Sequence, residues 1–277
     1  MPSSHVLAVD LGGTKSAWAV VDASGSIIER GREPAWRDYK GAAARVAGLA
    51  GGAAGVGVIV PGIYDTESGR AWAPNLWGMD EVPLRAELED RLGRAITIDS
   101  DRSGYVLGEQ WLGAARGLRD VVFVAIGTGI GAGILAGGRL IRGAHGIAGA
   151  VGWSALTCEW KDSYARTGCW ESESAGPALE RGAALDQAAE YTAMGVANLI
   201  STLNPAMVVL GGGVLQSEFP WTEEIRCRAA RWAQPLAFAR TRIERTTLGA
   251  DAGLFGAARL ALLACGIHTE SEGIDVG

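Results

Sequence analysis

Two short segments of this chain, 7–15 and 124–133, share one design and constrain the fold more than any other feature. They read LAVDLGGTK and VAIGTGIGAG. In each, an apolar strand-like run breaks into glycines accompanied by a threonine, and a second strand-like run follows. One such loop is usually an ordinary tight hairpin. Glycines also let backbone N–H groups approach phosphate oxygens, so two such loops in one chain favour two halves that hold a phosphate between them.

The order of the predicted elements supports two similar halves. The first half reads as three strands, a helix, a strand, a helix, a strand and a helix, over 5–12, 15–22, 26–33, 38–50, 56–62, 83–93, 95–100 and 101–113. The second half begins again with three strand-like runs and continues, after a loop-rich insert, with helix, strand, helix, weak strand and helix, over 120–129, 131–138, 139–144, 184–204, 206–214, 221–233, 242–248 and 252–264. Because each glycine loop leads into a strand, neither is a Walker A loop or a dinucleotide-binding GxGxxG loop, both of which open a helix.

This order predicts an α/β protein with two lobes that face a shared cleft. We expect an N-terminal lobe over 1–113 and a C-terminal lobe over 114–263, with a C-terminal helix over 264–277 packing back on the first lobe.

Composition excludes several classes of function. The net charge is −6 and the pI is about 5.2, which argues against a basic nucleic-acid-binding face. No apolar run approaches the roughly 20 residues that span a bilayer, and the N-terminus lacks the basic patch of a signal peptide. The four cysteines have no framework spacing. We therefore expect a cytoplasmic protein with reduced thiols and no membrane partner.

Eight motifs in order, spread from Val6 to Leu262, resemble the ROK family of sugar kinases within the actin-like ATPase superfamily. VDLGGTK and IGTGIGAGI are similar to the family's two phosphate loops. IDSDRSGYVLGEQ is similar to its (V/I).NDANA…GE helix start, and GCWE to its GCLE. The others are the PG…D…G…NL.GW…L segment from Val60, RGAHGIAGAVGW, NPAMVVLGGGV and LGADAGLFGAARLA.

The resemblance implies a two-lobed actin-like ATPase (ribonuclease H-like) fold and an ATP-dependent sugar kinase. Asp101 could be an ordinary carboxylate stabilised by the start of its helix. By resemblance it is the catalytic base that accepts the proton of a sugar hydroxyl as that oxygen attacks the γ-phosphate.

The resemblance also implies two sets of binding residues. We expect ATP, with Mg²⁺ near Asp10, to be bound by Asp10, Gly12, Gly13, Thr14, Lys15, Gly127, Thr128, Gly129, Gly211 and Gly212. We expect the sugar to be bound by Gly62, Asn75, Ser100 (in place of the family's asparagine), Asp101, Glu171 and Trp153.

Three departures from the family pattern affect the insert and the sugar pocket. The family's GE.GH line becomes GAVGW, so Ala150 replaces a sugar-binding glutamate and Trp153 a histidine that contacts sugar and binds structural zinc. The family's CxCGxxGC becomes DSYARTGC, which keeps only Cys169. A single thiolate cannot hold tetrahedral zinc, so no structural zinc is expected. A makeshift site of Cys158, Asp162 and Cys169 is the less favoured alternative; we expect the insert to be held by Trp153, Trp160, Tyr164 and Trp170.

The sequence predicts a kinase that phosphorylates the primary (6-) hydroxyl of a hexose or modified hexose. Loss of the glutamate and histidine favours an amino sugar such as kanosamine; a C7-cyclitol from antibiotic biosynthesis and plain glucose are alternatives. The rival of another class is a non-catalytic ROK sugar sensor or regulator. Family regulators carry an N-terminal helix-turn-helix, whereas the first phosphate loop here starts at Asp10, so we expect an enzyme. The sequence leaves open the donor, ATP or polyphosphate, the pathway and the oligomeric state, although the family is often homodimeric.

Overall fold

The computed structural model describes residues 5–267 and 274–276. Its N-terminal sheet has the strand order β3-β2-β1-β4-β7. The strands and helices of this lobe are β1 (His5–Leu11), β2 (Lys15–Asp22), β3 (Ile27–Pro34), α1 (Tyr39–Leu49), β4 (Val56–Val60), β5 (Ile63–Asp65), β6 (Arg70–Trp72), α2 (Pro74–Trp77), α3 (Leu84–Leu92), β7 (Thr97–Ser100) and α4 (Asp101–Leu112).

The C-terminal sheet repeats this topology with the order β10-β9-β8-β11-β12. Its elements are β8 (Val121–Ile126), β9 (Ile130–Ala136), β10 (Arg139–Leu140), α5 (Tyr164–Thr167), α6 (Cys169–Ser174), α7 (Gly176–Glu180), α8 (Leu185–Leu203), β11 (Met207–Gly211), α9 (Trp221–Ala229), α10 (Pro235–Arg240), β12 (Arg242–Arg245) and α11 (Ala252–Ala264), with short 3₁₀ turns at Val151–Trp153, Gly213–Gln216 and Gly249–Asp251.

The two sheets correspond strand by strand. β1 pairs antiparallel with β2 and parallel with β4, just as β8 pairs antiparallel with β9 and parallel with β11. Each glycine loop therefore joins the first two strands of its sheet, as the sequence predicts. The predicted third strand of the second half, 139–144, is shorter than expected because only Arg139 and Leu140 pair with β9.

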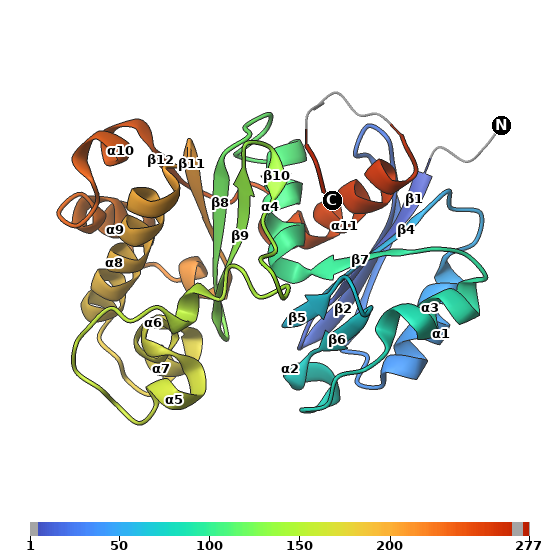
Figure 1. The fold of residues 1–277 in the computed structure, drawn as a ribbon, viewed down its shortest axis with the longest axis horizontal. Coiled ribbons are helices and arrows are strands. Elements are labelled where there is room, and N and C mark those ends of the chain that lie inside the picture. Colours follow the sequence, from blue (N-terminus) through green and yellow to red (C-terminus); the bar gives the residue numbers. More distant parts are fainter. Residues whose placement is uncertain (1–4, 268–273, 277) are drawn as a thin grey trace.

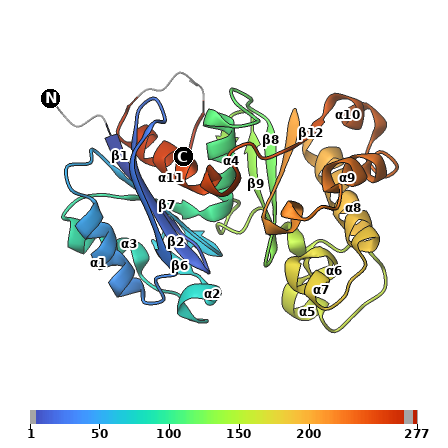
Figure 2. The ribbon, with the colours of Figure 1, turned by 180° about the vertical axis from the view of Figure 1, so that it is seen from behind.

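Helices α4 and α11 lie between the two sheets (Figures 1 and 2). One apolar core joins both lobes across these helices. Its buried members include Val6 on β1, Leu107 on α4, Phe123 on β8 and Leu260 on α11. Two further cores lie on the outer faces of the sheets, one beneath α1 and α3 and the other beneath α8 and α9.

The helix that packs on the N-terminal lobe differs from the expected range. It is α11, Ala252–Ala264, which contacts β1, β4 and α4, whereas we expected a helix over 264–277. The physical reason is composition, because α11 is apolar on nearly every face and is buried over most of its length. Cys265 and Gly266 form a turn, and residues 268–273 and 277 of the expected range lie outside the described residues.

Helix length and hydropathy decide whether a helix could span a membrane. Among the residues that the structure describes, none of the helices is long and apolar enough to cross a bilayer.

Candidate functional site

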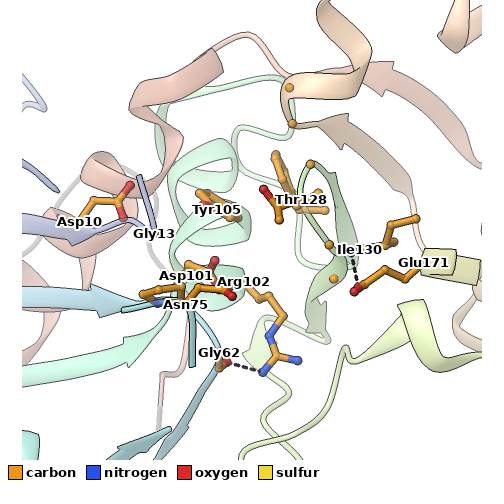
Figure 3. A pocket seen from close by; sticks show the side chains of 18 of the residues that line it. Asp10, Gly13, Gly62, Asn75, Asp101, Arg102, Tyr105, Thr128, Ile130 and Glu171 are labelled. Atoms are coloured by element: carbon orange, nitrogen blue, oxygen red, sulfur yellow. Dashed lines mark hydrogen bonds between the residues drawn. The ribbon is translucent and has the colours of Figure 1, made fainter. Parts of the chain in front are cut away.

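A cleft of about 1380 Å³ opens between the two lobes. The N-terminal lobe contributes the β1–β2 turn, the β4–β5 loop and the first turn of α4, and the C-terminal lobe contributes the β8–β9 turn and the start of α6 (Figure 3). The predicted site residues that line it are Asp10, Gly13, Thr14, Gly62, Asn75, Asp101, Gly127, Thr128, Gly129, Trp153, Glu171 and Gly212. Most of the predicted site is thus brought together from both halves of the sequence.

Asp101 is the first residue of α4, and its carboxylate faces the cleft (Figure 3). Its Oδ1 accepts a hydrogen bond of 2.8 Å from the backbone N–H of Arg102. Burial raises the pKa of Asp101 to about 6, against the lowering effects of Arg102 and of a hydrogen bond from the Tyr105 hydroxyl. A carboxyl group with a pKa near neutrality is well matched to accepting a proton from an alcohol during phosphoryl transfer.

Asp10 is the second-last residue of β1, just before the first glycine loop, and it lines the same cleft as Asp101. Burial, and then the charge of Asp101, raise the pKa of Asp10 to about 7, whereas the charge of Arg32 lowers it. A carboxylate oxygen is the kind of hard ligand that Mg²⁺ prefers. Asp10 therefore fits the role of holding Mg²⁺, directly or through water, beside the phosphates.

The two glycine loops face each other across the cleft, with Gly13 and Thr14 on one side and Gly127 to Gly129 on the other. Gly212 adds a third turn: its φ is +104°, and a Cβ there would lie 2.2 Å from the carbonyl oxygen of Ile126. Only glycine fits such a position. Backbone N–H groups and threonine hydroxyls around an open space are the groups that bind phosphate oxygens.

Four predicted site residues do not line the cleft. Ser100, expected to bind sugar, is buried, and its hydroxyl instead caps α4 by accepting from the N–H of Ser103 at 3.4 Å. Gly211 packs against Phe123, where a Cβ would lie 2.4 Å from the ring. Lys15 begins β2 with an exposed side chain, and Gly12 lies beside it in the turn. None of these four residues is among the lining residues of the cleft.

Among the residues expected to bind sugar, Glu171 is held in place through one carboxylate oxygen. Its Oε2 accepts a hydrogen bond of 2.7 Å from the N–H of Ile130, and burial raises the pKa of Glu171 (Figure 3). Asn75 lies against Gly13 of the first glycine loop. Ala150 and Trp153 also line the cleft, and 56% of Trp153 is exposed. The indole offers one N–H donor and a flat apolar face where the family resemblance gives histidine.

Several lining residues were missed at the sequence level. Arg102 and Tyr105 follow Asp101 on α4, and Thr246 to Leu248 lie in the loop after β12. The helical spacing of Asp101 and Tyr105, four residues apart, could have placed Tyr105 on the same face. The loop is held by long-range bonds: the buried carboxylate of Glu109 on α4 accepts from the hydroxyls of Thr246 and Thr247 and from the N–H of Leu248.

The insert is held together by aromatic and polar contacts. The ring of Trp170 is fully buried, and the hydroxyl of the buried Tyr164 donates to Glu173 at 2.6 Å. Trp160 packs edge-on against Tyr164 but is mostly exposed. Cys169 is buried and Cys158 is exposed. Within the described ranges, no three or more His, Cys, Asp or Glu side chains gather as a metal site.

Comparison with known proteins agrees with this geometry. The model of the ROK family matches residues 6–184 and 182–263. A glucokinase of Halalkalibacterium halodurans is 25% identical over 311 aligned positions, which cover 92% of this chain and 94% of that enzyme.

Solved structures share the fold. A ROK hexokinase from Thermus thermophilus is 30% identical with a TM-score of 0.83. The match covers 95% of this chain and 100% of the hexokinase. A ROK glucokinase from Streptomyces griseus, solved with glucose and AMPPNP, is 25% identical with a TM-score of 0.75. The match covers 94% of this chain and 99% of the glucokinase. The expected actin-like ATPase fold is thereby confirmed, and this chain belongs to the ROK family.

Proposed function

We propose that this chain is an ATP-dependent sugar kinase that transfers the γ-phosphate to the primary (6-) hydroxyl of a hexose, with a modified hexose such as kanosamine as the preferred acceptor. Its reaction class, phosphotransfer to an alcohol group, is that of the glucokinases to which it aligns over most of its length. The observation that carries the proposal is the placement of Asp101, with a pKa near 6, on a cleft lined by both glycine loops.

Different residues act on the sugar hydroxyl and on the phosphates during the transfer. The Asp101 carboxylate accepts the proton of the sugar hydroxyl while the hydroxyl oxygen forms a bond to the γ-phosphorus. The bond from the γ-phosphorus to the β–γ bridging oxygen breaks, and ADP leaves. Gly13, Thr14 and Thr128 supply donors to the phosphate oxygens. Mg²⁺ held near Asp10 would offset the phosphate charge when bound.

The acceptor is inferred from what the pocket lacks. Ala150 cannot hydrogen-bond a ring hydroxyl, and a buried hydroxyl without a partner costs about 1–3 kcal/mol. The Glu171 carboxylate remains on the acceptor side, where a substrate ammonium could make a charge-assisted bond that a hydroxyl cannot match. This difference supports an amino sugar over glucose. A C7-cyclitol kinase and a plain glucokinase are the alternatives of the same class, and a sugar sensor without catalysis is the alternative of another.

The proposal is tested by a coupled ADP-release screen over glucose, aminohexoses and C7-cyclitols, with ATP and polyphosphate as donors. We expect ATP-dependent turnover, with a higher kcat/KM for an aminohexose or cyclitol than for glucose. If none of the acceptors is phosphorylated but calorimetry shows that a sugar binds, the result would favour the non-catalytic sugar sensor.

Asp101→Asn is the matched variant for catalysis. It keeps the shape and a hydrogen-bonding oxygen but removes the base, so kcat should fall by about 10²–10⁴. Sugar affinity, measured by calorimetry, should change little. Near-normal turnover in this variant would remove Asp101 from the mechanism.

Ala150→Glu with Trp153→His tests the acceptor preference. The double variant restores the family's hydrogen-bonding groups, so the ratio of kcat/KM for glucose to that for the best aminohexose should rise by at least about tenfold, which corresponds to one regained hydrogen bond. If the wild-type chain already prefers glucose to every other acceptor, the amino-sugar proposal is wrong while the kinase assignment stands.

A further inference from the structure

Arg102 connects the two walls of the acceptor side of the cleft. It is the second residue of α4, next to Asp101, and its guanidinium lines the cleft. Nη2 donates to the carbonyl oxygen of Gly62 at 3.0 Å (Figure 3), and Nη1 donates to the carbonyl oxygens of Ala148 at 3.2 Å and Ile147 at 3.4 Å. One side chain thus holds three backbone carbonyls.

These carbonyls belong to different lobes. Gly62 lies in the loop between β4 and β5 of the N-terminal lobe, whereas Ile147 and Ala148 lie in the loop that follows β10 of the C-terminal lobe and leads to Ala150 and Trp153. The loop is anchored to its own lobe by the bond from the N–H of Ala132 to the carbonyl oxygen of Gly149. Arg102 therefore fixes the spacing between the two loops.

The fit of the Arg102 stem is tight. A Cβ on Gly131 of β9 would lie 2.9 Å from Arg102 Cδ, and a Cβ on Gly133 would lie 2.0 Å from the Arg102 carbonyl oxygen. The stem is therefore confined against a strand surface that only glycine leaves open. A planar guanidinium confined in this way loses little conformational entropy when it donates to several acceptors. A lysine ammonium, on a flexible stem, cannot reproduce this set of hydrogen bonds.

A second arginine anchors the base of the same loop farther from the cleft. Arg142 forms a buried ion pair with Asp99 of β7, with Nη2 and Oδ2 2.6 Å apart, and neither residue lines the cleft. The loop from 143 to 150 is thus tied to the N-terminal lobe by an ion pair at its start and by Arg102 near its middle. Only the second tie borders the place where the acceptor would lie.

We propose that Arg102 is a positioning residue that sets acceptor affinity and specificity by clamping the 143–150 loop to the Gly62 loop. This inference rests on the proposed function for its kinetic consequence, but the clamp itself is a statement about the fold. The resemblance places alanine at this position, so the clamp belongs to this chain's altered pocket, where Ala150 and Trp153 have replaced the glutamate and histidine.

The test combines kinetics with amide hydrogen exchange on Arg102→Ala, Arg102→Lys and Arg166→Ala. Arg166 also lines the cleft, and in the described part of the chain its side chain makes no hydrogen bond or ion pair, so Arg166→Ala removes a positive charge from the cleft without breaking a bond. Arg102→Lys keeps the positive charge beside Asp101 that lowers the pKa of Asp101. In Arg102→Ala, the KM for the best acceptor should rise by about tenfold or more while the KM for ATP stays within about twofold. Arg102→Lys should recover only part of this loss.

Exchange at the amides of 143–150 should be faster in both Arg102 variants and unchanged in Arg166→Ala. If the amides of 143–150 exchange at the same rate in Arg102→Ala as in the wild type, the proposed clamp is wrong. Faster exchange with an unchanged acceptor KM would overturn the positioning role. If the wild-type chain phosphorylates no acceptor, the proposed function fails, and the exchange measurement still decides whether the clamp exists.

Discussion

At the scale of single residues, burial and two neighbouring side chains set the pKa of Asp101. Burial raises its pKa, whereas the charge of Arg102 and the hydrogen bond from Tyr105 lower it. The balance leaves a pKa of about 6, so Asp101 is mostly ionised at neutral pH and yet basic enough to take a proton. The sequence could indicate Asp101 through its motif, but the value of its pKa depends on side chains that the fold brings to it.

Tyr105→Phe should move the acid limb of the pH profile. The phenylalanine keeps the ring contact with Phe123 but removes the hydroxyl that stabilises the carboxylate, so the pKa of Asp101 should rise further. The base works only when ionised, and therefore kcat/KM for the acceptor should fall at a higher pH than in the wild type. A profile from pH 5 to 9 measures this. Rates near pH 8 should differ less than rates near pH 6; an acid limb that stays in place or moves to lower pH would contradict the role of Tyr105.

At the scale of elements, the insert between β10 and α8 is held by aromatic packing and one buried carboxylate. Glu173 accepts from the Tyr164 hydroxyl and from Lys161, while Trp170 fills the core beneath. A fully buried tryptophan contributes several kcal/mol to stability, about 3–5 by substitution with alanine. The insert still presents Glu171 to the cleft, as the resemblance implies.

We expect the purified protein to contain no stoichiometric zinc, because Trp153, Asp162 and Tyr164 stand where three zinc ligands would be. Elemental analysis should find well under one zinc per chain, and the thermal midpoint should be the same with and without a strong chelator. One tightly held zinc per chain would instead indicate ligation by Cys158 and Cys169, and their double substitution by serine should then abolish it.

At the scale of the whole molecule, α4 and α11 pack against each other between the two sheets, and α4 also packs against β8 and β9 of the C-terminal lobe. The helices approach closely because both carry glycine: a Cβ on Gly256 would lie 1.8 Å from the carbonyl oxygen of Gly104, and a Cβ on Gly108 would lie 2.2 Å from that of Ala252. The position of α4 also sets the position of Asp101 at its first residue. The position of α4 between the sheets and the placement of the proposed base therefore depend on the same contact.

Gly256→Ala should lower the free energy of unfolding by about 1–3 kcal/mol, because backbone atoms of α4 cannot move aside without disturbing the core. Turnover should fall as well. Gly48→Ala is the matched control, since a Cβ at Gly48 of α1 meets no atom within 4 Å. This control should be neutral or stabilising by up to about 1 kcal/mol, because alanine favours helix. Urea unfolding measures both; equal stabilities of the two variants would show that the glycine contact is not tight.

The sequence by itself determined the features that follow from local pattern. Alternating and continuous apolar runs predict the strands, and the repeated glycine loops predict two similar lobes. The resemblance of eight motifs to the ROK family implies phosphoryl transfer to a sugar. These inferences hold because strand formation, tight turns and the start of a helix depend mainly on residues close together in the chain. The family and the fold that the motifs resembled are confirmed.

Tertiary structure alone decided which residues face the cleft. The direction of a side chain depends on strand register and helix phase, so Ser100 and Gly211 became a cap and a packing site while Arg102 and Tyr105 entered the cleft. The contact of Arg102 with the carbonyl of Ala148, 46 residues away, arises only when the two lobes meet, and its contact with the carbonyl of Gly62, 40 residues away, arises only when α4 packs beside the β4–β5 loop. Such contacts join segments distant in the chain, and no local pattern encodes their distance or their effect on the pKa of Asp101.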